Sequence, residues 1–96
     1  MKVLVKEPGK RWEKRNIENT LEALQEIVDG YIETLTLADN MVAIFDEEGR
    51  IKDKEWCVNI AGVDLVGTVI LTGIVGFDFT DIDPSLAKIL NAKEDD

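Results

Sequence analysis

The chain has 96 residues, 45% of them apolar and 32% charged, which is the composition of a small globular domain rather than of a disordered chain. Its 20 acids and 11 bases give a net charge of −9, which argues against general binding to nucleic acid or to an anionic membrane. Because the sequence has no histidine and one cysteine, it excludes a Ser-His-Asp or Cys-His triad, a histidine-ligated metal and an internal disulfide. We therefore predict a protein that is not an enzyme and that uses no cofactor or metal.

Neither the N-terminal stretch nor the longest apolar run of the sequence indicates a membrane or export step. The N-terminal stretch is too short for a signal-peptide core. The longest apolar run, residues 63–79, is interrupted by Asp64, two threonines and three glycines, which is unlike a membrane span. Cys57 as a lone thiol fits a reducing compartment, and we expect it to fill the core. These features predict a cytoplasmic protein.

The chain begins with a strand pattern and continues into a basic segment. Residues 1–6 are rich in Val and Leu with period two, which predicts a first strand, and Pro8-Gly9 ends it. Residues 10–16 are either a long loop or the hairpin partner of that strand. Trp12 lies in this segment and is expected to fold back into the core.

The clearest element is an amphipathic helix over residues 19–29. Asn19 is its predicted N-cap, with Glu22 in a capping-box position, and Gly30 supplies the left-handed residue that ends it. Apolar side chains fill one arc of the helical wheel, and acidic side chains with one glutamine fill the other.

Strand patterns dominate the rest of the chain, and a short helix closes it. Asp83 with Pro84 predicts the start of that helix. The fold class is therefore α+β, a small antiparallel or mixed sheet with one main amphipathic helix packed on one face and a short C-terminal helix. The predicted strands are residues 31–37 and 41–45, joined as a hairpin, 56–60 as a short strand or irregular segment that includes Trp56 in the core, and 67–73 as a buried strand.

Charge divides this single domain of residues 1–96 into unequal parts. Residues 1–16, the basic strand and loop, hold six bases and two acids, a net charge of +4. Residues 17–96 hold five bases and 18 acids, a net charge of −13. Within them, residues 17–92 form the acidic body and residues 93–96 are expected to be a frayed acidic tail.

Several segments together resemble a known family. They are Lys2–Val5 with Pro8-Gly9, Thr20–Gln25 leading into Val28–Glu33, the predicted hairpin ending in Asp46–Gly49, and the stretches 59–62 and 64–69. This pattern resembles a family of roughly hundred-residue domains of unknown function carried by Gram-positive bacteria, their phages and their mobile elements. The family has no established active site, so the resemblance implies only context, that of a small accessory protein of a mobile element.

The acids of the predicted helix suggest a binding surface. Glu22 and Glu26 are one turn apart, Asp29 lies at the helix end where the macrodipole disfavours an anion, and no lysine on the helix offsets them. Such a face can imitate the phosphates of a duplex and occupy the cationic groove of a nucleic-acid-handling protein. The predicted partner-binding residues are Glu22, Glu26, Asp29 and Glu33, then Asp46, Glu47 and Glu48.

The expected function is thus inhibition of a basic host protein, of the anti-defence or anti-CRISPR type, without direct contact to nucleic acid or membrane. Two alternatives stay open. A small molecule such as a nucleotide could be held by the basic loop, through Lys10, Arg11, Trp12 and Arg15, or the acidic face could serve only solubility. An edge strand in so small a sheet also allows a homodimer.

Overall fold

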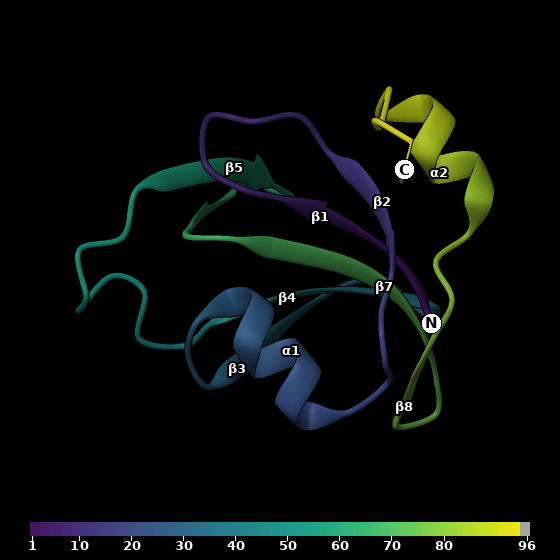
Figure 1. Cartoon of the computed structure of the whole chain (residues 1–96), viewed down its shortest axis with the longest axis horizontal. Helices are drawn as coiled ribbons and strands as arrows, with labels where there is room; N and C mark the ends of the chain where they lie inside the picture. The colour runs from purple at the N-terminus through teal and green to yellow at the C-terminus, as the bar shows by residue number, and fades with distance from the viewer. Residues whose placement is uncertain (95–96) are drawn as a thin grey trace.

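The computed structural model describes residues 1–94, which form an antiparallel sheet covered on both faces (Figure 1). The predicted α+β class is confirmed. The strands are β1 (Lys2–Lys6), β2 (Glu13–Asn16), β3 (Ile32–Ala38), β4 (Met41–Asp46), β5 (Trp56–Ile60), β6 (Val63–Val66), β7 (Val69–Val75) and β8 (Asp78–Thr80), and the helices are α1 (Leu21–Val28) and α2 (Pro84–Ile89).

Six strands form the main sheet, in the order β2-β1-β7-β4-β3, with β8 paired to the end of β7. The basic segment after Pro8-Gly9 is the hairpin partner of β1, with Lys2 opposite Asn16 and Val5 opposite Glu13. The predicted hairpin of β3 and β4 is present. β5 and β6 form a separate two-stranded sheet, and the sequence pattern had indicated neither β6 nor β8.

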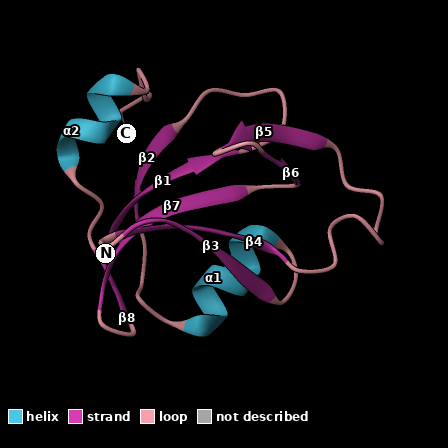
Figure 2. Ribbon diagram, turned by 180° about the vertical axis from the view of Figure 1, so that it is seen from behind, coloured by secondary structure: helices cyan, strands magenta, loops and turns pink. Residues whose placement is uncertain are grey.

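Each face of the sheet has its own core, because side chains alternate along a strand. On one face, Val3 and Val5 of β1 pack with Leu24 and Val28 of α1. On the other face, Leu4 joins a cluster of side chains from β5, β6, α2 and the segments beside them. Figures 1 and 2 show the two layers from opposite sides, with α1 below the sheet and with β5 and α2 above it.

β7 lies in the middle of the sheet and is buried on both faces. Ile70 packs toward α1, while Val69 and Leu71 pack toward the other core. A strand covered on both sides reads as a continuous apolar run, which explains the composition of residues 69–75.

The boundaries of α1 differ from the prediction. Thr20, not Asn19, is the N-cap, and its side chain accepts a hydrogen bond from the Ala23 N–H. The Asn19 side chain instead donates to the Phe79 carbonyl. The left-handed residue is Asp29 (φ 57°), one position before Gly30.

Two predictions about aromatic residues had different outcomes. Trp12 is in the core, with 8% of its surface exposed, as predicted. Trp56 is 56% exposed, so its assignment to the core is wrong. Its indole N–H donates to the Asp64 carboxylate, which lies across the β5–β6 hairpin.

The C-terminal segment is held against β2. The Lys93 N–H donates to the Trp12 carbonyl, and the Lys93 carbonyl accepts from the Lys14 N–H, so Lys93 runs along the outer edge of β2. The Glu94 carboxylate pairs with the Lys14 ammonium. The structure thus places Lys93 on the edge of β2 and ties Glu94 by one exposed ion pair, while the rest of the predicted tail, Asp95 and Asp96, lies outside the described residues.

Candidate protein-binding surface

α1 presents two of the predicted acids to solvent. Its inner side buries Leu24 and Val28 against the sheet, and this packing fixes which side of the helix faces outward. Glu22 and Glu26 are both exposed, one turn apart on the outer side. We call this outer side of α1, with Glu22 and Glu26, the acidic face.

No cation neutralises the acidic face within residues 1–94. The ion pairs of the described chain involve other acids, and no Lys or Arg nitrogen lies within 4.0 Å of the carboxylates of Glu22 or Glu26. Like charges at this spacing destabilise a helix by a few tenths of a kcal/mol. The two carboxylates are therefore available to a cation on another molecule.

The structure also brings Glu48 to the C-terminal end of α1. Glu48 lines a shallow hollow together with Gln25, Gly30, Tyr31 and the cationic Lys52. The N–H of the neighbouring Glu47 donates to the Tyr31 carbonyl at 2.9 Å, and the Glu47 side chain is exposed. These two acids follow β4 directly, but only Glu47 is fully exposed, since Glu48 is half-buried beside Lys52.

Asp46 does not belong to this surface, and the prediction that it presents a free carboxylate is wrong. It is the last residue of β4, points to the α1 side and is 3% exposed. Its Oδ2 lies 2.8 Å from the Lys54 ammonium and 2.9 Å from that of Lys52, and its Oδ1 accepts from the Glu48 N–H. Burial by itself raises the pKa of Asp46, but the hydrogen bonds from Lys54 and Lys52 outweigh it and lower the pKa to about 2.

The same two lysines complete the C-terminus of α1. The Lys54 ammonium donates to the carbonyls of Val28 and Asp29 at 2.8 and 2.9 Å, and the Lys52 ammonium donates to the Asp29 carbonyl at 3.2 Å. Cations at this position oppose the negative end of the helix dipole. The counterions that the helix itself lacks therefore come from the loop between β4 and β5, which is visible at the left of Figure 1.

Asp29 lies at this junction and is only loosely paired. Its carboxylate is 3.9 Å from the Lys54 ammonium, and its side chain is 94% exposed. Of the predicted acids, Asp29 therefore remains accessible, but the Lys54 ammonium lies close to its carboxylate. Sequence reasoning missed both lysines because they lie more than twenty residues after the helix.

Glu33 lies on the other side of the sheet. In the β3–β4 register it is opposite Phe45, whose side chain packs with the core beyond α1, whereas its neighbour Ile32 packs toward α1. Glu33 is exposed, but it does not extend the acidic face as predicted. Side chains alternate between the two faces of the sheet along a strand, so the neighbours Ile32 and Glu33 point to opposite faces.

The basic loop does not form the predicted ligand clamp. The Trp12 ring is in the core and offers no face for stacking. Arg11 donates to the Asn91 carbonyl at 2.9 Å, Arg15 pairs with Glu13 at 2.9 Å, and Lys10 pairs with a neighbouring acid. Most of its cations are thus used to hold the loop and the C-terminal segment in place.

The remaining acids have structural roles or stand apart. Asp83 caps α2, accepting from the Ser85 N–H and hydroxyl at 2.9 Å, and Asp81 accepts from the Lys2 N–H. Within residues 1–94 no three acidic or sulfur side chains gather as metal ligands would. Neither helix of the described chain is long and apolar enough to cross a membrane.

These features define a small α+β domain with an acidic face on its main helix that is unpaired within residues 1–94. The family model for a domain of unknown function, DUF3846, matches residues 1–94, and the chain belongs to that family. This confirms the predicted membership of a small domain family without an assigned function. No curated protein and no solved structure matches the chain.

Proposed function

We propose that this protein is a non-catalytic inhibitor that uses the acidic face of α1 to occupy a cationic groove on a host protein. The partner is a nucleic-acid-handling or defence protein, and the setting is the cytoplasm of a host cell that carries a phage or mobile element. The proposal is of the anti-defence, or anti-CRISPR, type.

One observation carries the proposal. Glu22 and Glu26 are exposed without a counterion in residues 1–94, whereas the nearby lysines Lys52 and Lys54 are engaged by Asp46 and by the helix carbonyls. A surface that serves solubility alone usually mixes both signs of charge. Here Lys54 is mostly buried and Lys52, although partly exposed, is paired with Asp46, whereas Glu22 and Glu26 face solvent without a counterion in the described chain, which favours a basic partner.

The mechanism follows from charge and position. A cationic groove that binds a duplex is adapted to the closely spaced negative charges of phosphates. A helix with exposed carboxylates presents similar charges to that groove without being a nucleic acid. The net charge of −9 accelerates encounter with a basic protein, and salt weakens this attraction. Binding then excludes the nucleic acid by competition.

Charge reversal tests the proposal. The double variant Glu22→Lys/Glu26→Lys is compared with Glu33→Lys/Asp39→Lys, which changes net charge equally at exposed positions outside α1. Each is used to capture proteins from host lysate at low and high salt. We expect the wild type and the control to retain a nucleic-acid-binding protein at low salt, and the α1 variant to lose it.

Function is measured on that captured protein. Adding the wild-type chain should release the partner's nucleic acid in a mobility-shift assay, and the α1 variant should need at least tenfold more protein for the same effect. Equal loss in both double variants would indicate a nonspecific charge effect. If neither double variant lost the ability to bind the partner and release its nucleic acid, the acidic face would serve solubility only. Either of these two results would contradict the proposal.

A further inference from the structure

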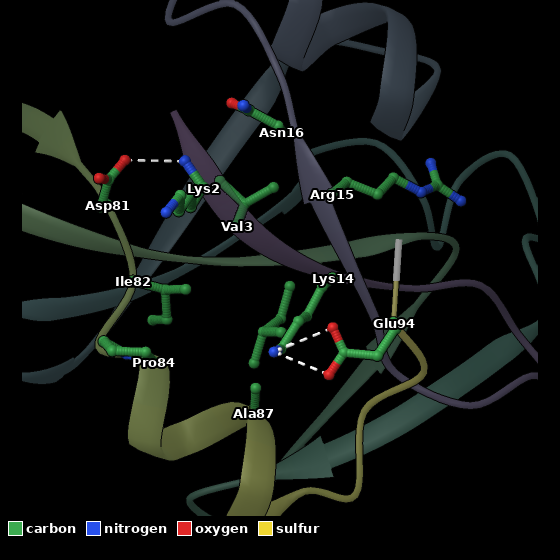
Figure 3. Close-up of a pocket in the computed structure, with 11 residues that line it drawn as sticks. Lys2, Val3, Lys14, Arg15, Asn16, Asp81, Ile82, Pro84, Ala87 and Glu94 are labelled. Carbon is green, nitrogen blue, oxygen red and sulfur yellow. Dashed lines mark hydrogen bonds and ion pairs between the residues drawn. The ribbon is translucent and has the colours of Figure 1, made fainter. Parts of the chain in front are cut away.

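A second candidate site lies on the opposite side of the sheet from α1. There a cleft of about 450 Å³ opens between the β1–β2 hairpin and α2 (Figure 3). This volume is within the range of roughly 300–1,000 Å³ that is typical of small-molecule sites. The cleft is distinct from the acidic face and does not depend on the proposed function.

The strand register places cationic and apolar groups together in the cleft. Lys2 is opposite Asn16 and Leu4 is opposite Lys14, so these four side chains share the face of β1–β2 that looks toward α2. Leu4 is fully buried there and belongs to the same core cluster as Ile82 and Ala87. The result is an apolar floor that is almost closed to solvent, because Ile82 is 6% and Ala87 3% exposed, with the exposed Pro84 beside it. The rim holds the amino groups of Lys2 and Lys14 and the carboxylate of Asp81.

Lys14 and Arg15 both line the cleft, but their charged groups lie differently. Figure 3 shows the Lys14 ammonium beside Ala87, with Ile82 on the same side of the cleft, while the Arg15 guanidinium extends away from it. Arg15 alternates to the other face of β2 and pairs with Glu13. Lys14 and Lys2 are therefore the cations of the cleft that an anion could bind.

A carboxylate of the chain itself, that of Glu94, already pairs with the Lys14 ammonium. Both oxygens of Glu94 accept from the Lys14 ammonium, at 2.9 and 3.2 Å. The Glu94 side chain is 76% exposed, and ion pairs exposed to this degree contribute little to stability because solvent screens them. Glu94 thus shows which group Lys14 accepts, and a better-fitting anion can displace it.

We propose that this cleft binds a small organic anion with an apolar body. Its carboxylate or phosphate group replaces Glu94 on Lys14, with Lys2 at the other end of the rim, and its apolar part packs against Pro84 and the outer edges of Ile82 and Ala87. Glu94 is then an internal competitor that lowers the affinity for such a ligand.

The test uses three probes of defined chemistry. Octanoate and phenyl phosphate each carry an anionic group and an apolar body, and inorganic phosphate carries the anionic group alone. Each is titrated into isotope-labelled protein at constant ionic strength, and backbone amide shifts are followed. We expect saturable shifts at Lys2, Lys14, Ile82 and Ala87 with at least one organic anion.

Three variants sharpen the test. Glu94→Gln should lower the Kd at least threefold because the competitor is lost, and Lys14→Gln should raise it at least tenfold. Lys88→Gln, on α2 but outside the cleft lining, should leave it unchanged. The spectrum of each variant away from the cleft reports whether the fold is intact.

Three results would overturn the proposal. These are no saturable shift with either organic anion, equal affinity in Lys14→Gln and wild type, and binding of inorganic phosphate as tight as that of phenyl phosphate. The last result would mean a simple ion contact without a role for the apolar floor. A weaker Kd for phenyl phosphate than for octanoate, or the reverse, identifies which anionic group the rim prefers.

Discussion

Asp46 joins three parts of the molecule through one carboxylate. It lies at the end of β4, binds Lys52 and Lys54 of the following loop, and so fixes the lysines that complete the C-terminus of α1. Gly30 passes directly beside it, and a Cβ at that position would collide with the Asp46 carboxylate. The glycine is therefore needed for close approach, while Asp29 takes the left-handed conformation.

Replacing Asp46 by Asn should lower stability in a pH-dependent way. The folded protein holds the pKa of Asp46 at about 2, below its ordinary value of 3.8, so its stabilisation is present above pH 4 and is lost as the pH falls through about 2. This corresponds to about 2 kcal/mol at pH 7. Urea unfolding of wild type and Asp46→Asn at pH 7 and pH 2 measures it.

The matched control is Asp39→Asn in the exposed β3–β4 turn, which should leave the free energy of unfolding almost unchanged. The difference between wild type and Asp46→Asn should shrink toward zero at the lower pH. A difference that stays constant from pH 7 to pH 2 would show that the carboxylate charge is not what stabilises this junction.

At the level of elements, both helices are fixed by side-chain caps and by contacts from distant segments. Thr20 caps α1 and Asp83 caps α2, in each case by accepting a backbone N–H of the first turn. The C-terminus of α1 is completed by lysines from the β4–β5 loop, and the free edge of β2 is covered by Lys93. The short elements of this fold therefore depend on tertiary contacts as well as on local preference.

Thr20→Ala should destabilise the protein by about 1 kcal/mol, because the Ala23 N–H loses its acceptor. Thr20→Ser keeps a hydroxyl at the same position and should retain most of the stability. Asn19→Ala removes only an exposed hydrogen bond to Phe79 and should have a smaller effect. Thermal and urea unfolding compare the three. A larger loss for Asn19→Ala than for Thr20→Ala would restore Asn19 as the cap.

At the level of the whole molecule, the two layers enclose the single thiol. Cys57 is 1% exposed on β5 and packs between the small β5–β6 sheet and the main sheet. Burial raises the pKa of the Cys57 thiol, so little thiolate forms near neutral pH. A thiol reagent can therefore reach it only when the layers separate.

Labelling of Cys57 should report global opening. In the native protein we expect a thiol reagent to react at least a thousandfold more slowly than in urea-unfolded protein. If Asp46→Asn lowers stability by about 2 kcal/mol, it should speed labelling roughly thirtyfold when closing is fast. Rapid labelling of the native wild type would instead show that β5–β6 opens locally, without unfolding of the main sheet.

The candidate surface was predictable only in part. The helix pattern correctly placed Glu22 and Glu26 on the exposed side of α1, because a 3.6-residue period and a buried stripe determine which side faces outward. The same reasoning could not place Asp46 or Glu33. Asp46 is paired with lysines that follow it by six and eight residues around an irregular loop, and the orientation of Glu33 depends on strand register.

The sequence by itself determined the α+β class, the first strand, the amphipathic helix, the β3–β4 hairpin, the doubly buried β7 and the excess of negative charge. Each rests on a local period, a turn residue or a sum over composition, and none needs contacts between distant residues. Only the tertiary structure decided which acids keep a free carboxylate and that Trp56 is exposed instead of buried in the core. It also decided that Lys14 faces an apolar cleft beside Glu94, 80 residues away. Ion pairing and burial depend on which segments meet in space. These segments lie at opposite ends of the chain for Lys14 and Glu94, and on either side of an irregular loop for Asp46 and Lys54.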